Sequence, residues 1–478
     1  MITPKDHNQY VLFPNPFDEH LDSENRWVVF SKILPWDKLS SYYYRQMDSG
    51  MGAGTLEARI ILGAVIIKHH ENLSDEGTIE AIQENLYMQY FLGLPTFKKE
   101  KVFAPSLFVE IRKRLGTSYW QDINMLIIEH NTKKAEEDVD KNNPKENEGT
   151  INMDASVFEQ DITYPTDLKI LNDSREKLED IIATVCLTTN QEMPRTYKRV
   201  ARRDFLNVAK KKKCTYKQIR KGNGKQLNYV CRDLKHIETL LKDQTDLTGI
   251  LDKHQLKYLQ VINTVYAQQQ YMHKNNIHKV EDRIVSIHQP HVRPIVRGKA
   301  GKPVEFGSKI GITIHNGLTY LDNLDWNNYN EADDLKVSAQ NYKTRNGYYP
   351  KKINADQKYM TRANRDWCKE NNIFLSGKPL GRPGEKIKEQ TRELKQSASQ
   401  RNCVEGKFGQ AKRFYFNDAI RARLNRTSES MIGAVIVVLN LVRLAQQHAL
   451  SFFTFWVNKI SSTIFRFFYK NDWIGLFE

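Results

Sequence analysis

The chain has 478 residues, and its 72 Lys and Arg against 57 Asp and Glu give a formal net charge of +15. This length exceeds one typical domain and predicts two or three folded units, while the basic balance favours a polyanionic partner such as nucleic acid. The five cysteines are odd in number and lack CxxC spacing, which argues against a disulfide framework or a zinc site and indicates a reducing, cytoplasmic location. The N-terminus lacks the cationic start and apolar core of a secretory signal.

The first part of the chain predicts a compact helical domain over residues 1–130. Apolar residues at three- and four-residue spacing predict helices over 55–70 and 75–92, and a further helix is expected over 106–115. Ser74 is the expected N-cap of the second of these helices.

After a polar, charged linker at 131–149, strand-like runs alternate with helical segments. The strand-like runs cover residues 150–158, 283–289, 307–321, 351–355 and 373–376. The dipeptide Asn316-Gly317 is a strong signal for a hairpin turn. Residues 165–282 are predicted to be a helical, basic insertion after the first strand, so that 150–164 and 283–446 form one α/β domain.

The basic excess is concentrated in residues 195–225, which hold thirteen Lys or Arg and one acid, Asp204. Aromatic residues are interleaved with these cations, and such a patch is typical of a surface that follows DNA phosphates. The candidate DNA contacts are Arg202, Arg203, Lys210, Lys211, Lys212 and Lys213. The alternative is a pair of soluble, exposed helices that bind nothing.

Two apolar stretches lie near the C-terminus. The first, MIGAVIVVLNLVRLAQ, is too short to span about 30 Å of hydrocarbon and predicts a buried core helix. The second, in an aromatic tail over 447–478, is interrupted by Lys459 and Arg466 and is expected to pack on the core or on a partner. No membrane role is expected.

Three carboxylates stand in unlike local contexts: Asp154 in a strand-like run, Asp356 just past another, and Glu405 in a basic, helix-compatible stretch. Carboxylates brought together from distant elements are what a two-metal phosphoryl-transfer site needs, and Mg²⁺ prefers such oxygen ligands. Taken singly, each of them could equally be solvated surface.

Helical spacing places a metal-ligand candidate between two cations. At 100° per residue, Arg401, Glu405 and Lys412 point within about 60° of one another on one helix face. The alternative is an ordinary surface ion pair with a nearby lysine, worth roughly 0.2 to 0.5 kcal/mol.

Longer strings carry a resemblance to a known family. The segments MDASVFEQDITYPTDLKILNDSREKLEDII, GKPVEFGSKIGITIHNGLTYLD, NADQKYMTRANRDWCKENNI, LGRP and RNCVEGKFGQAKRFY resemble a bacterial insertion-sequence transposase of the DDE class. The stretch YYYRQMDSGMGAGTLEARIILGAVIIKHHENLSDEGTIEAIQENLYMQYFLGLP is similar to the amino-terminal domain of those transposases. Together the matching strings cover most of residues 40–445.

The resemblance implies a ribonuclease-H-like mixed sheet flanked by helices, with Asp154, Asp356 and Glu405 as catalytic metal ligands. It implies Mg²⁺ as cofactor, with Mn²⁺ as a substitute. The family motif around the glutamate reads Tyr, two residues, Arg, three residues, Glu, six residues, Lys. Arg401, Glu405 and Lys412 fit it, but Ala398 stands where the Tyr should be.

The departure at position 398 puts in doubt any step that needs the tyrosine to hold a displaced or hairpinned strand end. By the same resemblance, Arg401, Lys412 and Arg413 would neutralise DNA phosphates. The helical N-terminal domain would bind the element's ends or assist dimerisation, or it would only pack against the catalytic domain.

The expected function is therefore a DDE transposase that binds the terminal inverted repeats of its insertion sequence. It would act as a homodimer on double-stranded DNA, both element ends and target, with two-metal strand cleavage and strand transfer. One alternative is a catalytically silent DNA-binding protein or repressor derived from a transposase. Another is a nonspecific metal-dependent nuclease, against which the N-terminal domain and the long insertion argue.

Overall fold

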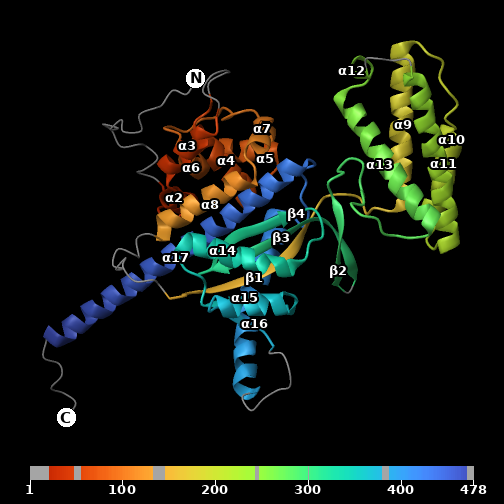
Figure 1. Cartoon of the computed structure of the whole chain (residues 1–478). Helices are drawn as coiled ribbons and strands as arrows, with labels where there is room; N and C mark the ends of the chain where they lie inside the picture. Colours follow the sequence, from red (N-terminus) through yellow and green to blue (C-terminus); the bar gives the residue numbers. More distant parts are fainter. Residues whose placement is uncertain are drawn as a thin grey trace.

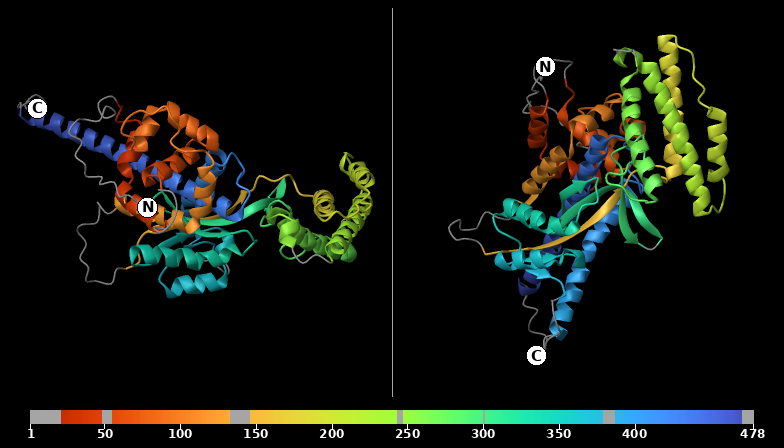
Figure 2. Two further views of the ribbon diagram at one scale, coloured as in Figure 1. Left: turned by 90° about the horizontal axis from the view of Figure 1, so that it is seen from above. Right: turned by 45° about the vertical axis from the view of Figure 1, so that its right-hand side comes forward.

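The computed structural model describes residues 21–47, 55–132, 146–242, 247–299, 301–378 and 387–470. Most of the predicted linker, residues 133–145, and the last eight residues of the predicted tail lie outside these ranges. The described chain forms a helical N-terminal part, a mixed sheet with helices on its faces, and a separate helical unit (Figures 1 and 2).

The described residues of the N-terminal part form helices joined by loops. Its helices are α2 (Arg26–Ile33), α3 (Trp36–Arg45), α4 (Ala58–His70), α5 (Asp75–Glu84), α6 (Leu86–Phe91), α7 (Leu107–Arg114) and α8 (Thr117–Thr132). Ser74 caps α5 as predicted, because its side chain accepts a hydrogen bond from the Gly77 amide. The predicted helix over 75–92 is divided at Asn85, whose side chain accepts from the Met88 amide and so begins α6.

The last helix, α17 (Asn425–Lys470), completes the core of the N-terminal helices. The Trp120 Nε1 of α8 donates to the Ser430 Oγ of α17 over 3.0 Å. The two helices approach closely at Gly433, where an added Cβ would lie 2.7 Å from the Trp120 Cβ. The segment Asn425–Ala449 is long and apolar enough to cross a membrane, but 72% of its apolar window is buried inside the protein. The predicted buried core helix is confirmed.

The sheet is built around one central strand. Its strands are β1 (Thr150–Glu159), β2 (Arg293–Lys299), β3 (Lys302–His315), β4 (Leu318–Asp325), β5 (Lys352–Asn354) and β6 (Phe374–Ser376). Strand β1 pairs antiparallel with β3 and parallel with β5, β4 pairs with β3, and β6 pairs with β5. The strand order is therefore β4-β3-β1-β5-β6, with β2 forming a hairpin with the first half of β3.

Two sequence-based expectations about the strands have opposite outcomes. The hairpin at Asn316-Gly317 is confirmed, because both residues have positive φ (51° and 81°) and join β3 to β4. The strand expected over 283–289 is wrong. There the Ile284 amide donates to the Gln268 side chain instead of to a neighbouring strand, and pairing begins only after Pro290, in β2.

Helices cover both faces of the sheet. Alternate residues of β1 point to opposite faces. On one face, Ile151 and Met153 pack with α14 (Asp334–Asn346) and α15 (Arg362–Glu370). On the other, Phe158 packs edge-on against Phe408 of α16 (Ile387–Gln410) at 6.1 Å between ring centroids.

A separate helical unit lies between β1 and β2 in the chain and stands beside the sheet (Figure 1). It consists of α9 (Asp167–Thr189), α10 (Lys198–Ala209), α11 (Tyr216–Leu241), α12 (Leu247–Ile250) and α13 (Lys253–Asn275). Leu171, Ile182, Val230 and Ile262 are fully buried in a core of its own.

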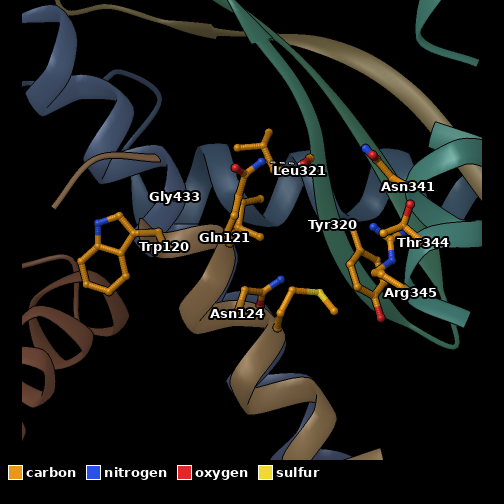
Figure 3. Close-up of a pocket in the computed structure, with 11 residues that line it drawn as sticks. Trp120, Gln121, Asn124, Tyr320, Leu321, Asn341, Thr344, Arg345 and Gly433 are labelled. Carbon is orange, nitrogen blue, oxygen red and sulfur yellow. Dashed lines mark hydrogen bonds between the residues drawn. The ribbon is translucent and has the colours of Figure 1, made fainter. Parts of the chain in front are cut away.

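A cavity of about 230 Å³ lies where α8, β4, α14 and α17 meet. Figure 3 shows the residues that line it. The Arg345 guanidinium lies 4.0 Å from the centroid of the Tyr320 ring on one side of it. None of the residues that line this cavity is a predicted site residue.

Candidate active site and nucleic-acid interface

Asp154 lies in the middle of the central strand β1. Its Oδ1 accepts a hydrogen bond from the Ala155 amide over 2.8 Å. Burial raises the pKa of the Asp154 carboxyl above its ordinary value; the Ala155 amide and Arg401 oppose this shift, while Asp356 and Glu331 add to it. A carboxylate in such a place is poorly solvated, and a cation near it would be strongly attracted.

Asp356 lies beside Asp154 because their strands are parallel neighbours. Asn152 of β1 is in register with Asn354 of β5. Two residues later come Asp154, which is still on β1, and Asp356, which lies just beyond the end of β5. Asp356 caps the short helix η3 (Gln357–Tyr359) by accepting from the Gln357 amide over 2.7 Å. Its side chain is 44% exposed and lies 3.1 Å from the Arg401 Nη1.

Helix α16 is fixed across these strands by polar contacts. Asn354 Nδ2 donates to Gln400 Oε1 over 3.0 Å and to Asn152 Oδ1 over 2.8 Å. Lys412 Nζ donates to Ser156 Oγ over 2.9 Å, two residues along β1 from Asp154. Cationic side chains from α16 and the turn after it therefore reach the sheet next to both aspartates.

Glu405 lies on α16, four residues after Arg401, and is exposed. Among the residues that the structure describes, no group of three or more His, Cys, Asp or Glu lies together in a way that could hold a metal ion. A π-helical turn, Ala411–Tyr415, follows Gln410, so the regular 100° spacing does not continue to Lys412. The structure therefore brings Asp154 and Asp356 together, and the ligand role of Glu405 stays a prediction.

The two aspartates fit a hard divalent cation. Mg²⁺ usually takes only one or two protein carboxylates and completes its coordination with water and substrate phosphate oxygens. The paired carboxylates of Asp154 and Asp356 supply ligands of this kind, one partly buried and one half exposed toward solvent.

One residue near the site had no signal in the sequence. Glu331, in the short helix η2 (Glu331–Asp333), is only 7% exposed and adds to the raised pKa of Asp154. Its Oε1 lies 3.0 Å from Lys309 Nζ. An isolated glutamate before two aspartates gives no spacing pattern, so only the folded structure reveals its place.

The predicted basic surface lies on the helical unit. Arg203 and Lys210, Lys211, Lys212 and Lys213 are exposed, whereas Arg202 pairs with Glu176 over 2.9 Å. Arg413, on the π-helical turn, is also exposed.

An aromatic stack adds two arginines to this surface. Tyr197 has a left-handed backbone, with φ of 58°, and begins α10. The guanidinium groups of Arg195 and Arg232 each lie 4.5 Å from the centroid of its ring. Stacking of this kind holds an arginine side chain in place while leaving its N–H groups free to bind.

Comparison with known proteins gives two family matches. Residues 353–442, which contain Asp356, Arg401 and Glu405, match the model of the transposase DDE domain. Residues 15–114 match that of a transposase domain, DUF772. Both matches are to transposase domains, and together they support a DDE-class transposase.

A curated relative of this transposase is the "Uncharacterized protein ORF8 in nfe locus" of Rhizobium meliloti. The two are 26% identical over 162 residues, which is 33% of this chain and 73% of the relative. No solved structure matches the transposase. The two matched domains support a transposase function, and the family implies DNA as its substrate and typically uses a divalent metal.

Proposed function

We propose that this transposase binds the terminal inverted repeats of its own insertion sequence, cleaves the DNA at their boundaries and joins the freed ends to target DNA. The observation that carries the proposal is the placement of Asp154 and Asp356 on neighbouring parallel strands, with Arg401 of α16 against Asp356. Two carboxylates and a cation from distant elements meet there. Asp356 and Arg401 lie within the DDE match, and Asp154 precedes it in the chain.

The catalytic domain, residues 150–164 and 283–446, is proposed to be ribonuclease-H-like. In support, the strand order is β4-β3-β1-β5-β6, with β1 antiparallel to β3 and parallel to β5. Asp356 lies just past the end of β5, where the ligands of an open α/β sheet bind, and Asp154 lies on the neighbouring strand β1. The helical residues 165–282 are then an insertion after the first strand, and residues 1–130 and 447–478 are an N-terminal domain and a tail.

Asp154, Asp356 and Glu405 would hold Mg²⁺, or Mn²⁺ in its place. Bound ions of this class activate the attacking oxygen and stabilise the leaving oxygen of a phosphoryl transfer. Asp356 already faces a cation, Arg401, and Asp154 lies beside it in a poorly solvated position. The chain's own part is to position the DNA and to neutralise its phosphates.

The cationic groups have separate tasks in this proposal. Arg401, Lys412 and Arg413 neutralise phosphates next to the carboxylates, and the basic surface of the helical unit follows the DNA backbone farther away. The protein would work as a homodimer that holds both element ends. All five cysteines are free thiols, which suits a cytoplasmic site of action.

The test is cleavage of labelled duplexes that carry the inverted repeats flanking the gene, with Mg²⁺, with Mn²⁺ and with neither. Wild type is expected to cut at the repeat boundary only with metal, whereas Asp154→Asn, Asp356→Asn and Glu405→Gln bind the duplex without cutting it. Asp366→Asn is the matched control, since Asp366 is an exposed acid of α15 within the same family match. Cleavage that survives the Asp154 or Asp356 substitution contradicts the proposed site.

A second function is favoured by one observation, the exposed position of Glu405 outside any three-carboxylate group of the described residues. In that case the chain is a catalytically silent DNA-binding protein or repressor of its parent element. Binding of the repeats without metal-dependent cutting by wild type would establish this alternative.

A further inference from the structure

We propose that Glu331 is a positioning residue for the Asp154–Asp356 pair. It would act through a buried ion cluster, here called the Glu331 cluster, made of Glu331, Arg297, Lys309 and Lys358. The inference rests on the proposed function, because it assigns the cluster the task of holding the two aspartates at a fixed separation.

The Glu331 cluster joins four separate segments of the chain. Glu331 Oε1 lies 3.0 Å from Lys309 Nζ of β3 and 3.6 Å from Arg297 Nη1 of β2. Glu331 Oε2 lies 3.6 Å from Lys358 Nζ of η3. Glu331 and Lys309 are 7% and 4% exposed, so the centre of the cluster is shielded from water.

The outer members of the cluster lie next to each aspartate, Arg297 through a backbone contact and Lys358 through its place in the chain. Arg297 Nη1 donates to the carbonyl oxygen of Ala155, the residue after Asp154, over 3.2 Å. Lys358 lies two residues after Asp356, in the turn that Asp356 itself caps. Glu331 therefore links the strand of the first aspartate to the turn of the second.

A neutral contact reinforces the same link. The buried Asn364 Nδ2 donates to the Ala332 carbonyl of η2 over 2.8 Å and to the Tyr359 carbonyl of η3 over 2.9 Å. Tyr359 is fully buried. The helices η2 and η3 are thus joined by one ion pair and one bridging amide, and a shift of η2 would be transmitted to the turn at Asp356.

The charges indicate positioning and not metal binding by Glu331. Both of its carboxylate oxygens face cations of the cluster, Oε1 toward Lys309 and Arg297 and Oε2 toward Lys358. The buried Glu305 also lies 3.7 Å from Arg297, which gives the cluster and its neighbour three cations against two carboxylates. The cluster is held by its own ion pairs, and its part is to keep these segments together beside the two aspartates.

Lys358→Met is the cleanest test, because the Lys358 side chain is 59% exposed and its loss should leave the fold intact. Three quantities are measured on the full-length protein: binding of repeat duplexes by mobility shift, the rise in Tm on adding Mn²⁺ without DNA, and cleavage against Mn²⁺ concentration. We expect unchanged duplex binding, a smaller Mn²⁺-induced rise in Tm, and at least a tenfold higher Mn²⁺ concentration for half-maximal cleavage, since misplacement by about 1 Å can cost about 100-fold.

Further variants test whether the charge of Lys358 and its partner Glu331 cause the effect. Lys358→Arg keeps the charge and should restore the Mn²⁺ response, and Lys369→Met removes an exposed lysine of α15 as a matched control. Glu331→Gln should reproduce the defect of Lys358→Met more strongly. If it does not fold, the double variant Glu331→Gln with Lys309→Met removes the buried charge pair together and takes its place.

The outcomes separate this inference from the proposed function. A folded Lys358→Met and a folded Glu331 variant that both keep the wild-type Mn²⁺ response overturn the inference. Loss of duplex binding with an unchanged Mn²⁺ response also overturns it, by making Lys358 a DNA contact. If wild type cuts no DNA, the proposed function fails, and the Mn²⁺-induced change in Tm still decides whether the Glu331 cluster positions the aspartates.

Discussion

Replacing the four lysines between α10 and α11 by glutamine should flatten the salt dependence of DNA binding. Lys210, Lys211, Lys212 and Lys213 are all exposed, and none forms an ion pair within the described part of the chain. Each phosphate contact contributes about 0.9 to the slope of log affinity against log salt, so four contacts contribute up to about 3.6. Between 50 and 200 mM salt, wild type should lose roughly 150-fold more affinity than the variant, if all four lysines reach phosphates.

The assay is fluorescence anisotropy with a labelled repeat duplex at several KCl concentrations. A charge-matched control removes four exposed lysines from the α13 region of the same helical unit: Lys253, Lys257, Lys274 and Lys279. Both variants carry the same net charge, so a difference in slope reports the location of the lysines. Equal slopes for the two variants would refute the assignment of the α10–α11 surface as the DNA-binding face.

Three further predictions concern stability and the aromatic stack. Gly433→Ala should lower the free energy of unfolding by about 1 to 3 kcal/mol, because the new Cβ would lie 2.7 Å from the Trp120 Cβ. Gly409→Ala, whose new Cβ would have no neighbour within 4 Å, should raise it by up to about 1 kcal/mol. Thermal denaturation measures both changes. Burial raises the pKa of Asp233 to about 7 in the folded protein, above the value of about 4 in the unfolded chain. The stability that this shift contributes is fully present below pH of about 4 and is lost as the pH rises through about 7. Asp233→Asn should therefore reduce the loss of stability between pH 5 and 8 in urea unfolding, and an unchanged pH profile would contradict this. Tyr197→Ala should weaken duplex binding several-fold at unchanged circular dichroism, because the two arginines stacked on its ring are no longer held in place.

Local chemistry explains which parts of the fold could be predicted from the sequence. Asn316-Gly317 and Ser74 were predictable because turns and caps depend on a few neighbouring residues. The strand expected over 283–289 failed because the side chain of Gln268, on a helix of the inserted unit, supplies the hydrogen bond that a strand neighbour would have given. Contacts of that kind arise only after the chain has folded.

The candidate site was also predictable only in part. Asp154 and Asp356 were expected to meet because the resemblance assigns both as metal ligands, and the structure places them on neighbouring parallel strands. The relation of Glu405 to Lys412 could not be predicted, because Lys412 lies in a π-helical turn that breaks the regular spacing on which the prediction depended. Glu331 was missed because its significance comes from burial among cations on three other segments, which no local pattern encodes.

The contact between α8 and α17 has a consequence for the timing of synthesis. The hydrogen bond from Trp120 to Ser430 spans 310 residues, which take about 15 to 60 s to translate at roughly 5 to 20 residues per second. Throughout that interval the apolar face of α8 has no α17 to cover it. A nascent chain that is cut short therefore leaves this face exposed to aggregation and proteolysis.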